Sequence, residues 1–294
     1  MQLNPVEREG YLQVFIGAAI WGTIGFFVMV LSHYGSSAVL TSFLRLLFAT
    51  VIMVVLTGAR YGLRSLIVDR KTLGICALLG LICQGIYNIF YSEAVVQAGV
   101  TPSAVLLNTA PVFAAVEAHL LFHEEIGRRK VLPLVVDVVG CVLAVTGGHF
   151  DAGSLSMTGI LYGIGAGFCY SLTSVIGKIA GERTNAFVMS TYSYVFSALF
   201  LLFFLKPQDC ATAAQAPLLG VAFLYALLPT ALAYVIYFLG VQKIRDNSIV
   251  PVIASVETVV AALLGVLLFR EIPNLVSIVG ILLVLSSIYL LSRR

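Results

Sequence analysis

The sequence predicts an all-α integral membrane protein with ten transmembrane helices, arranged as two inverted repeats of five helices each. Three observations predict this fold. First, 60% of the 294 residues are apolar and only 11% are charged, with a mean hydropathy of +1.03. Second, the apolar residues gather in ten runs, each close to the length that a helix needs to cross a bilayer. Third, the second half of the chain resembles the first half.

The composition also excludes several classes of protein. Soluble domains carry about a quarter charged residues, which keep their surface hydrated. The 17 basic and 14 acidic residues are too few to cover a soluble globule, which excludes a cytosolic enzyme, a secreted disulfide scaffold and a disordered chain. The net charge of +3 does not indicate a nucleic-acid partner. No cofactor or metal is expected, since only His119 and His123 have the spacing of a ligand pair.

The ten predicted spans are joined by connections too short to form a soluble domain. A span needs about 20 apolar residues, because the hydrocarbon core is about 30 Å thick and a helix rises about 1.5 Å per residue. The runs show no period of two, so helices fit better than a transmembrane barrel. The spans cover residues 10–31, 37–57, 73–92, 101–122, 130–148, 156–177, 187–205, 217–240, 248–269 and 274–292.

The distribution of Lys and Arg predicts the orientation, because cytoplasmic loops of membrane proteins are enriched in these residues. With the N-terminus inside, 14 of the 17 basic residues fall on the cytoplasmic side; Lys206 and Arg270 fall outside, and Arg45 lies within a span. We therefore expect a multi-pass protein of the plasma membrane, the inner membrane of a bacterium, with cytoplasmic N- and C-termini. The 14 residues are Arg8, Arg60, Arg64, Arg70, Lys71, Arg128, Arg129, Lys130, Lys178, Arg183, Lys243, Arg245, Arg293 and Arg294.

An internal repeat becomes visible when the chain is shifted by 147 residues. Residues 112–124 (VFAAVEAHLLFHE) then align with residues 259–271 (VVAALLGVLLFRE), with seven identities in 13 positions, and Tyr87 aligns with Tyr234. We expect a first repeat in residues 1–148 and a second in residues 149–294. Because each repeat holds five spans, an odd number, the two copies enter the membrane in opposite senses, as in many secondary transporters.

The stretch from Tyr87 to Glu124 resembles the signature of the EamA domain of the drug/metabolite transporter superfamily. The resemblance covers essentially the whole chain, although Thr258 occupies the position of the expected proline in the second copy. It implies a central cavity lined by spans one to four and six to nine, with spans five and ten at the periphery, and transport of small organic solutes. The matching residues are Tyr87, Ala94, Ser103, Ala104, Pro111 and Glu124, together with Trp21–Gly22 and Leu44–Arg45.

Acidic residues within the spans are candidates for coupling, because ionisable groups inside a bilayer are costly and need a partner or a purpose. Glu257, at the centre of span nine, is the first candidate for binding a proton or an amine, and Glu117 in span four is the second. For both, the alternative is a hydrogen bond between helices. Asp137 lies in peripheral span five, where we expect a partner between helices, with Arg45 as a candidate. Glu124 and Glu271 are expected to cap or pair at helix ends.

A set of aromatic and amide residues predicts the solute site. Trp and Tyr usually lie at membrane interfaces, but these residues are too deep for that role, and stacked rings suit an amphipathic or cationic solute. Core packing is the alternative for each of them. Arg45 is either a clamp for a substrate carboxylate or a structural anchor. The candidates are Trp21, Arg45, Gln84, Tyr87, Asn88, Tyr91, Asn108, Tyr170, Tyr194 and Tyr234.

Together these observations predict a secondary active transporter that works by alternating access. The solute is a small amphipathic molecule, cationic or zwitterionic, such as an amino acid, an amine or a drug-like metabolite. Its transport is expected to be coupled to a proton or to another solute, and export of an amino acid or an amine is the specific expectation. The surface loops carry no paired-carboxylate motif, so an enzyme is not expected. An integral-membrane enzyme acting on lipid-linked substrates, or a channel, remains the alternative.

Overall fold

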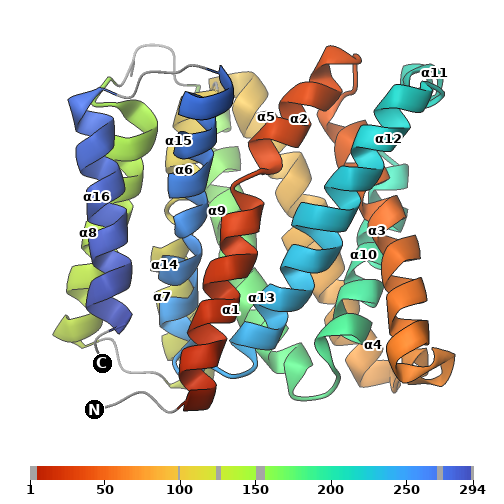
Figure 1. The fold of residues 1–294 in the computed structure, drawn as a ribbon, viewed down its shortest axis with the longest axis horizontal. Helices are drawn as coiled ribbons and strands as arrows, with labels where there is room; N and C mark the ends of the chain where they lie inside the picture. The colour runs from red at the N-terminus through yellow and green to blue at the C-terminus, as the bar shows by residue number, and fades with distance from the viewer. Residues whose placement is uncertain (1–4, 99, 124–126, 150–155, 270–273, 293–294) are drawn as a thin grey trace.

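The computed structural model describes residues 5–98, 100–123, 127–149, 156–269 and 274–292 (Figure 1). Within these ranges every regular element is a helix and no residue lies in a strand, which confirms the all-α prediction. Seven helical segments are long and apolar enough to cross a membrane. They are Pro5–His33, Ala38–Tyr61, Arg70–Ala98, Ser103–Phe122, Met157–Gly181, Ala216–Val241 and Asn247–Leu268.

Three of the ten predicted spans do not reach that threshold in the described residues. Ala186–Leu202 and Leu275–Leu290 are apolar but shorter. Helix α8 (Arg128–Thr146) has 19 residues, but it begins with three basic residues and contains Asp137. The structure thus supports a multi-pass helical membrane protein, and the arrangement of ten spans as an inverted repeat stays a prediction.

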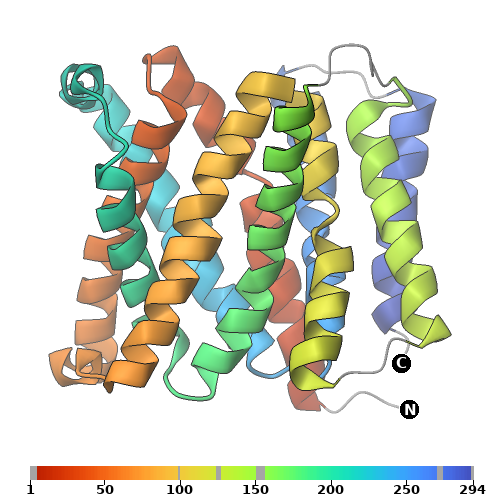
Figure 2. The ribbon, with the colours of Figure 1, turned by 180° about the vertical axis from the view of Figure 1, so that it is seen from behind.

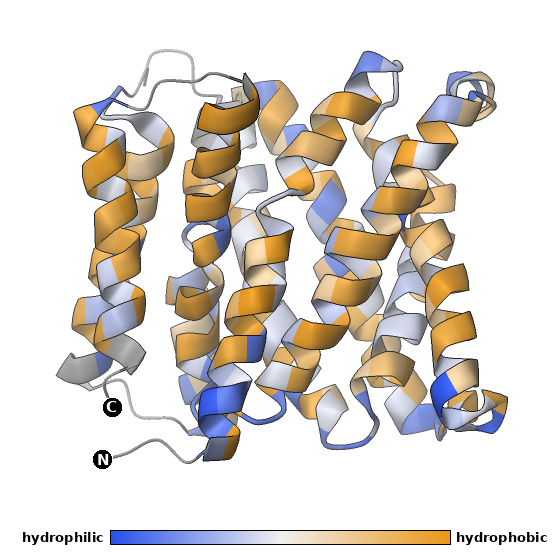
Figure 3. Ribbon diagram, viewed as in Figure 1, coloured by the Kyte–Doolittle hydropathy of each residue, from blue (hydrophilic) through white to orange (hydrophobic). Residues whose placement is uncertain are grey.

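The helices run between two ends of the molecule (Figures 1 and 2). Helix α1 begins and α16 ends at the lower end, where the α3–α4 and α9–α10 connections also lie. Hydrophilic residues gather at this end (Figure 3). The helices are α1 (Pro5–Trp21), α2 (Ile24–His33), α3 (Ala38–Tyr61), α4 (Arg70–Gly80), α5 (Tyr87–Ala98), α6 (Val100–Leu107), α7 (Ala110–Phe122), α8 (Arg128–Thr146), α9 (Met157–Gly181), α10 (Ala186–Leu202), α11 (Pro207–Ala213), α12 (Ala216–Tyr225), α13 (Ala233–Val241), α14 (Val250–Ala254), α15 (Val256–Phe269) and α16 (Leu275–Ser292), with short 3₁₀ turns at Leu63–Leu66 and Asn247–Ile249.

Several spans are interrupted or loosened near their middle. Helices α1 and α2 are separated at Gly22–Thr23, α6 and α7 at Asn108–Thr109, and α14 and α15 at Ser255. Two further spans contain a π-helical segment, Leu81–Ile86 between α4 and α5 and Ala226–Leu232 between α12 and α13. Interrupted and π-helical turns within a span are typical of functional positions, because they free backbone groups and redirect side chains.

The π-helical segment Ala226–Leu232 has a clear local cause. Pro229 lies inside it, and proline has no N–H to donate to the carbonyl four residues earlier. That acceptor belongs to Tyr225, and the Thr230 hydroxyl donates to it instead, at 3.0 Å. A π-helix pairs each carbonyl with the N–H five residues later, so the hydroxyl is an additional donor to the Tyr225 carbonyl next to the missing N–H of Pro229. The wide turn leads into the helix that carries Tyr234.

Helices α8 and α16 pack against each other as a pair at one edge of the bundle (Figures 1 and 2). They cross where glycines let the two backbones touch: a Cβ added at Gly280 would lie 2.2 Å from the Ala144 nitrogen and 2.7 Å from the Gly140 oxygen. This is the small-residue contact that membrane helices use in place of a hydrophobic driving force. Glycines of α9 pack in the same way: Gly159 against Ala98, and Gly163 against Leu106, as their spacing of four predicts.

We expect Gly280→Ala to destabilise the protein by about 1–3 kcal/mol, because the added methyl group meets backbone atoms that cannot rotate away. The thermal unfolding midpoint of the purified protein in detergent measures the effect. Gly74→Ala is the matched control, since a Cβ at Gly74 meets nothing within 4 Å and alanine favours the helix. A midpoint that falls equally in both variants, or in neither, contradicts the packing described for α8 and α16.

Candidate functional site

The interior of the bundle contains a cluster of aromatic rings centred on Trp21. Its ring centroid lies 4.6 Å from that of Tyr234, 4.6 Å from that of Tyr237 and 6.4 Å from that of Tyr170. Trp21 is the last residue of α1, at the interruption, whereas the tyrosines come from α9 and α13. The indole side chain is 3% exposed, and its Nε1 has no partner among the described residues. The cluster thus joins the two halves of the chain.

Glu257 lies in the first turn of α15, immediately beside this cluster. The Tyr170 hydroxyl donates to its carboxylate, 3.0 Å from Oε1 and 3.1 Å from Oε2. A Cβ added at Gly22 would lie 2.8 Å from the Glu257 carbonyl oxygen, so only glycine permits this approach of α1 to α15. Within the described part of the chain, no Lys or Arg forms an ion pair with Glu257. Among the described residues, the carboxylate therefore has Tyr170 as its hydrogen-bond partner and no neutralising cation.

Two more tyrosines extend the cluster towards α5. The Tyr87 ring centroid lies 6.0 Å from that of Tyr91 and 5.7 Å from that of Tyr170. Glu257, Tyr87, Tyr91 and Tyr170 all keep part of their surface exposed although they lie within membrane-spanning segments. Partly exposed rings and a carboxylate at this depth are the groups that a bound solute could cover.

Tyr194 completes the ring cluster on the side of α10. It is fully buried, its ring lies edge-on to Tyr234 at 6.0 Å, and its hydroxyl donates to the Thr230 oxygen at 3.0 Å. The Tyr194 hydroxyl thus binds the backbone of the π-helical segment Ala226–Leu232. Tyr194 is therefore a predicted aromatic residue whose hydroxyl bonds to the backbone.

Arg45 is buried, with 4% exposure, and it is only partly paired. Its Nη1 donates to the Tyr225 hydroxyl at 3.3 Å, and the guanidinium lies 5.2 Å from the centre of the Tyr225 ring. Its Nε and Nη2 have no hydrogen-bond partner among the described residues. Arg45 also interacts electrostatically with Tyr87, Tyr194 and Tyr234, so it lies at the edge of the same cluster with donors unused.

The proposed pairing of Asp137 with Arg45 is wrong. Asp137 accepts hydrogen bonds on Oδ1 from Ser255 at 2.6 Å and from Ser287 at 2.9 Å. The expected partner between helices therefore exists, but it consists of two serines on neighbouring helices. The sequence indicates the depth of each residue, whereas the choice of partner depends on which spans pack together, and α8 packs against α15 and α16.

The structure does not bring every predicted polar residue into the cluster. Gln84 does lie beside Tyr234, and its Oε1 has no partner among the described residues. Asn88 accepts from Ser42 at 2.8 Å and donates to the Gln84 carbonyl, while Asn108 donates to the Ala104 carbonyl of its own helix at 2.9 Å.

Glu117, the second coupling candidate, has a contact of its own. It accepts from Ser171 at 2.5 Å and is 8% exposed, with Oε2 unpaired among the described residues. Ser171 follows Tyr170 on α9, so the two acidic residues bind adjacent positions of one helix. The expected roles of Glu124 and Glu271 at helix ends lie outside the described residues.

Three contributors were missed by sequence reasoning. Tyr237 contacts Trp21 as closely as Tyr234 does, and its spacing of three from Tyr234, which places both on one helical face, was an available signal. Tyr225 belongs to no distinctive sequence pattern, yet its hydroxyl accepts a hydrogen bond from Arg45 and its ring stacks on Phe27 at 5.4 Å. Ser255 lies at the interruption of span nine, and neither it nor its immediate neighbours is a glycine or a proline.

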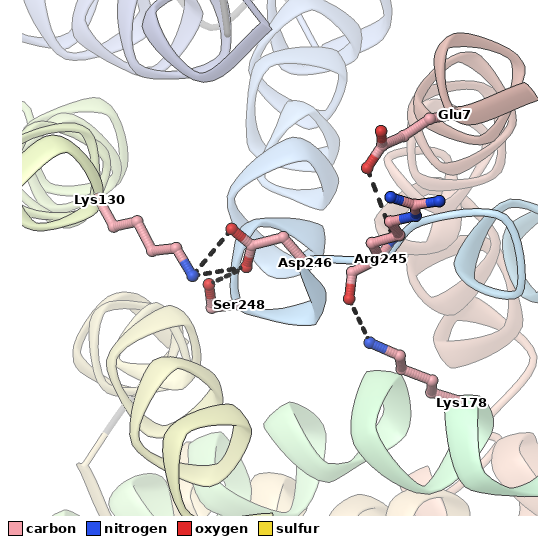
Figure 4. A network of polar contacts seen from close by, with 6 residues as sticks. All are labelled: Glu7, Lys130, Lys178, Arg245, Asp246 and Ser248. Atoms are coloured by element: carbon pink, nitrogen blue, oxygen red, sulfur yellow. Dashed lines mark hydrogen bonds and ion pairs between the residues drawn. The ribbon is translucent and has the colours of Figure 1, made fainter. Parts of the chain in front are cut away.

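A network of polar contacts ties several helices together at the lower end (Figure 4). Lys130 of α8 forms an ion pair with Asp246 at 2.8 Å. Lys178 of α9 donates to the Arg245 carbonyl, and the Arg245 amide donates to Glu7 of α1 at 3.5 Å. The segment between α13 and α14 is thus held by three different helices.

Comparison with known proteins agrees with a transporter. The profile of the EamA-like transporter family matches residues 8–146 and again residues 157–293. The fold is that of a multi-pass helical membrane protein, and the chain belongs to the EamA-like transporter family. The resemblance noted in the sequence is therefore confirmed.

Individual relatives are also named as transporters. The chain is 25% identical over 288 residues to an "Uncharacterized transporter" of Archaeoglobus fulgidus, covering 98% of this chain and 97% of that protein. It is 23% identical to the "Uncharacterized inner membrane transporter YicL" of Salmonella typhimurium, covering 97% and 95%. A crystal structure of a protein with 17% identity superposes with a TM-score of 0.79, over 97% of this chain and 99% of the other. That likeness concerns the fold alone.

We expect Tyr170→Phe to lower the free energy of unfolding by about 1–3 kcal/mol, because it removes the hydrogen-bond donor to the Glu257 carboxyl group within a membrane-spanning segment. Denaturation of the purified protein in mixed detergent micelles measures the change. Tyr162→Phe, on the same helix, is the matched control, since the Tyr162 hydroxyl forms no hydrogen bond within the described part of the chain and its ring packs on Phe90 at 5.5 Å. Equal stability of the two variants contradicts the Tyr170–Glu257 contact.

Proposed function

We propose that the protein is a secondary active transporter that moves a small amphipathic organic solute across the bacterial inner membrane by alternating access. One observation carries the proposal. Glu257 lies within a membrane-spanning segment with Tyr170 as its hydrogen-bond partner, beside aromatic rings from both halves of the chain. An acidic group without a neutralising cation at this depth is a functional position by default, because its cost requires a purpose.

The ground plan that we propose is two inverted repeats of five spans, in residues 1–148 and 149–294. Its support is the correspondence of the irregular turns. Under the 147-residue shift, the π-helical segment Leu81–Ile86 overlaps Ala226–Leu232, and the interruption after Asn108 falls at Ser255. Interrupted helices at matching positions of two halves commonly mark the solute site of transporters. The family profile also matches the chain twice.

The solute is cationic or zwitterionic in this proposal. Tyr87, Tyr91 and Tyr170 keep part of their surface exposed beside the buried Trp21 ring. An ammonium group is attracted to such aromatic rings, and Glu257 supplies the opposite charge. Arg45 has two unused donor nitrogens, which suit the carboxylate of a zwitterion. Arg45 and Glu257 both lie near Tyr87 and Tyr234, and in this proposal one zwitterion binds them together. Amino acids, amines and drug-like metabolites have this chemistry.

Alternating access requires contacts at one end to break as those at the other end form. We propose that the lower end is cytoplasmic, because the α3–α4 and α9–α10 connections lie there (Figure 1) and the sequence around them is rich in Lys and Arg. The contacts of Lys130, Lys178 and Glu7 with the segment Arg245–Asp246 would then hold the cytoplasmic side together in this conformation. A proton on Glu257, with Glu117 as a second carrier, is the coupling ion that we propose.

Proteoliposomes separate this function from its rivals. Saturable counterflow of a labelled amine or amino acid supports a carrier, an ion current supports a channel, and a chemically altered product supports an enzyme acting on lipid-linked substrates. We propose a carrier because the described rings and Glu257 form a compact group of mutually contacting side chains, which suits binding rather than conduction.

We expect Glu257→Gln to lower the counterflow of an amine by more than about tenfold, because a lost charge-assisted contact is equivalent to about 1.4 kcal/mol or more. Glu93→Gln is the matched control: Glu93 lies in α5 and accepts from Gln97 at 3.1 Å, away from the ring cluster. Initial rates in proteoliposomes give the comparison, at equal protein content. A Glu257→Gln protein that transports at the rate of the wild type, with the same pH dependence, removes Glu257 from the mechanism.

For Arg45 we expect a change of selectivity. Arg45→Gln should weaken binding of an amino acid by about 10–100-fold, and it should leave the corresponding decarboxylated amine unaffected, since only the carboxylate uses the guanidinium. The ratio of the two affinities, measured by thermal stabilisation within one variant, does not depend on its basal stability. If Arg45→Gln weakens the binding of the amino acid and of the amine by the same factor, Arg45 is a structural anchor.

A further inference from the structure

Asp137 lies outside the proposed solute site, yet it is a completely buried carboxylate in a peripheral helix. Its exposure is 0%, its Oδ1 accepts from both Ser255 and Ser287, and its Oδ2 has no partner among the described residues. A buried acid of this kind is costly. Packing does not require it, since α8 and α16 already meet in backbone contact at Gly140 and Gly280.

The contacts of α8 fall on both sides of Glu257. Ser255 precedes Glu257 by two residues, and Asp137 binds it at 2.6 Å. Thr258 follows Glu257, and its Oγ1 lies 3.9 Å from the Sγ of Cys141, one turn after Asp137 on α8. Helix α8 therefore holds span nine immediately before and after the residue that we propose to bind the solute.

Ser255 has one hydroxyl proton and two acceptors for it. Asp137 Oδ1 and the Val252 carbonyl both lie 2.6 Å from its Oγ. A bond to Val252 closes the last turn of α14 on itself, in the manner of a serine that bends its own helix. A bond to Asp137 ties the interruption between α14 and α15 to α8 instead. The acceptor that Ser255 uses thus decides how the first turn of α15 is oriented.

We propose that Asp137 is a positioning residue: by accepting the Ser255 hydroxyl at the interruption of span nine, it fixes Glu257 against Tyr170. The inference rests on the proposed function insofar as Glu257 contacts the solute. The peripheral pair of helices then takes part in solute binding through one hydrogen bond, besides its role as scaffold.

Two serines provide a matched test, because both donate to the same oxygen of Asp137 and only Ser255 lies at the interruption. In counterflow assays, Ser255→Ala and Asp137→Leu should raise the apparent KM for the amine by about tenfold, the equivalent of one hydrogen bond to a charged group. The kcat should stay within about twofold, since the residues of the lower-end network are unchanged. Ser287→Ala should leave both constants near those of the wild type, and Asp137→Asn, which keeps an acceptor oxygen, should rescue the leucine variant.

A second measurement does not depend on transport. Trp21 is the single tryptophan of the chain, and its neighbour Gly22 is in close contact with Glu257 and Val260 of α15. A reoriented α15 should therefore shift the emission maximum of Trp21 and its quenching by acrylamide. Ser255→Ala and Asp137→Leu should show this shift, whereas Ser287→Ala and Asp137→Asn should not.

The outcomes separate the two proposals. If the wild type shows no counterflow with any amine or amino acid, the proposed function fails, and the fluorescence of the four variants still decides the positioning role. Equal effects of Ser255→Ala and Ser287→Ala overturn that role, as does an asparagine variant as impaired as the leucine variant. Should Asp137→Leu fail to fold, the comparison of the two serine variants decides alone.

Discussion

The constraint that shapes this molecule is the cost of an unsatisfied polar group in the hydrocarbon core. Every irregular turn inside a span frees backbone donors or acceptors, and each must find a partner within the protein. The Thr230 hydroxyl donates to the Tyr225 carbonyl beside Pro229. At the first interruption, the Thr23 hydroxyl and the Thr23 N–H both donate to the Ile20 carbonyl, at 2.7 Å and 3.0 Å. Two of these irregular turns, at Gly22–Thr23 and at Ser255, lie next to the Trp21 ring and the Glu257 carboxylate. The positions where the backbone needs extra partners are therefore also the positions of the candidate site.

Span nine connects most of these elements. Its interruption is held by Asp137 from the peripheral pair, its next turn carries Glu257, and Tyr170 of α9 binds that carboxylate. On the opposite side, the Trp21–Gly22 turn packs against the same helix. A movement of α15 would therefore change its contacts both with the ring cluster and with α8. Such shared contacts can couple a solute site to the movement of helices.

Composition and hydropathy were sufficient for the helical fold, because the length and apolarity of a span are local properties of the sequence. The aromatic candidates were also found in this way, since Tyr and Trp far from a membrane interface need an explanation. Partners were not predictable: Asp137 was assigned to Arg45 on depth alone, and the packing of α8 against α15 and α16 gave it two serines. The contact at Ser255 was equally hidden, because its hydroxyl donates to Asp137 on another helix.

The most direct test of the central claim is an experimental structure of the protein with a bound amine or amino acid. The account predicts ligand density between Trp21, Tyr87 and Tyr170, with the ammonium group within hydrogen-bonding distance of Glu257. Density confined to the lipid-facing surface, or a ligand bound elsewhere while Glu257 remains fully enclosed by Tyr170 and its neighbours, would contradict it.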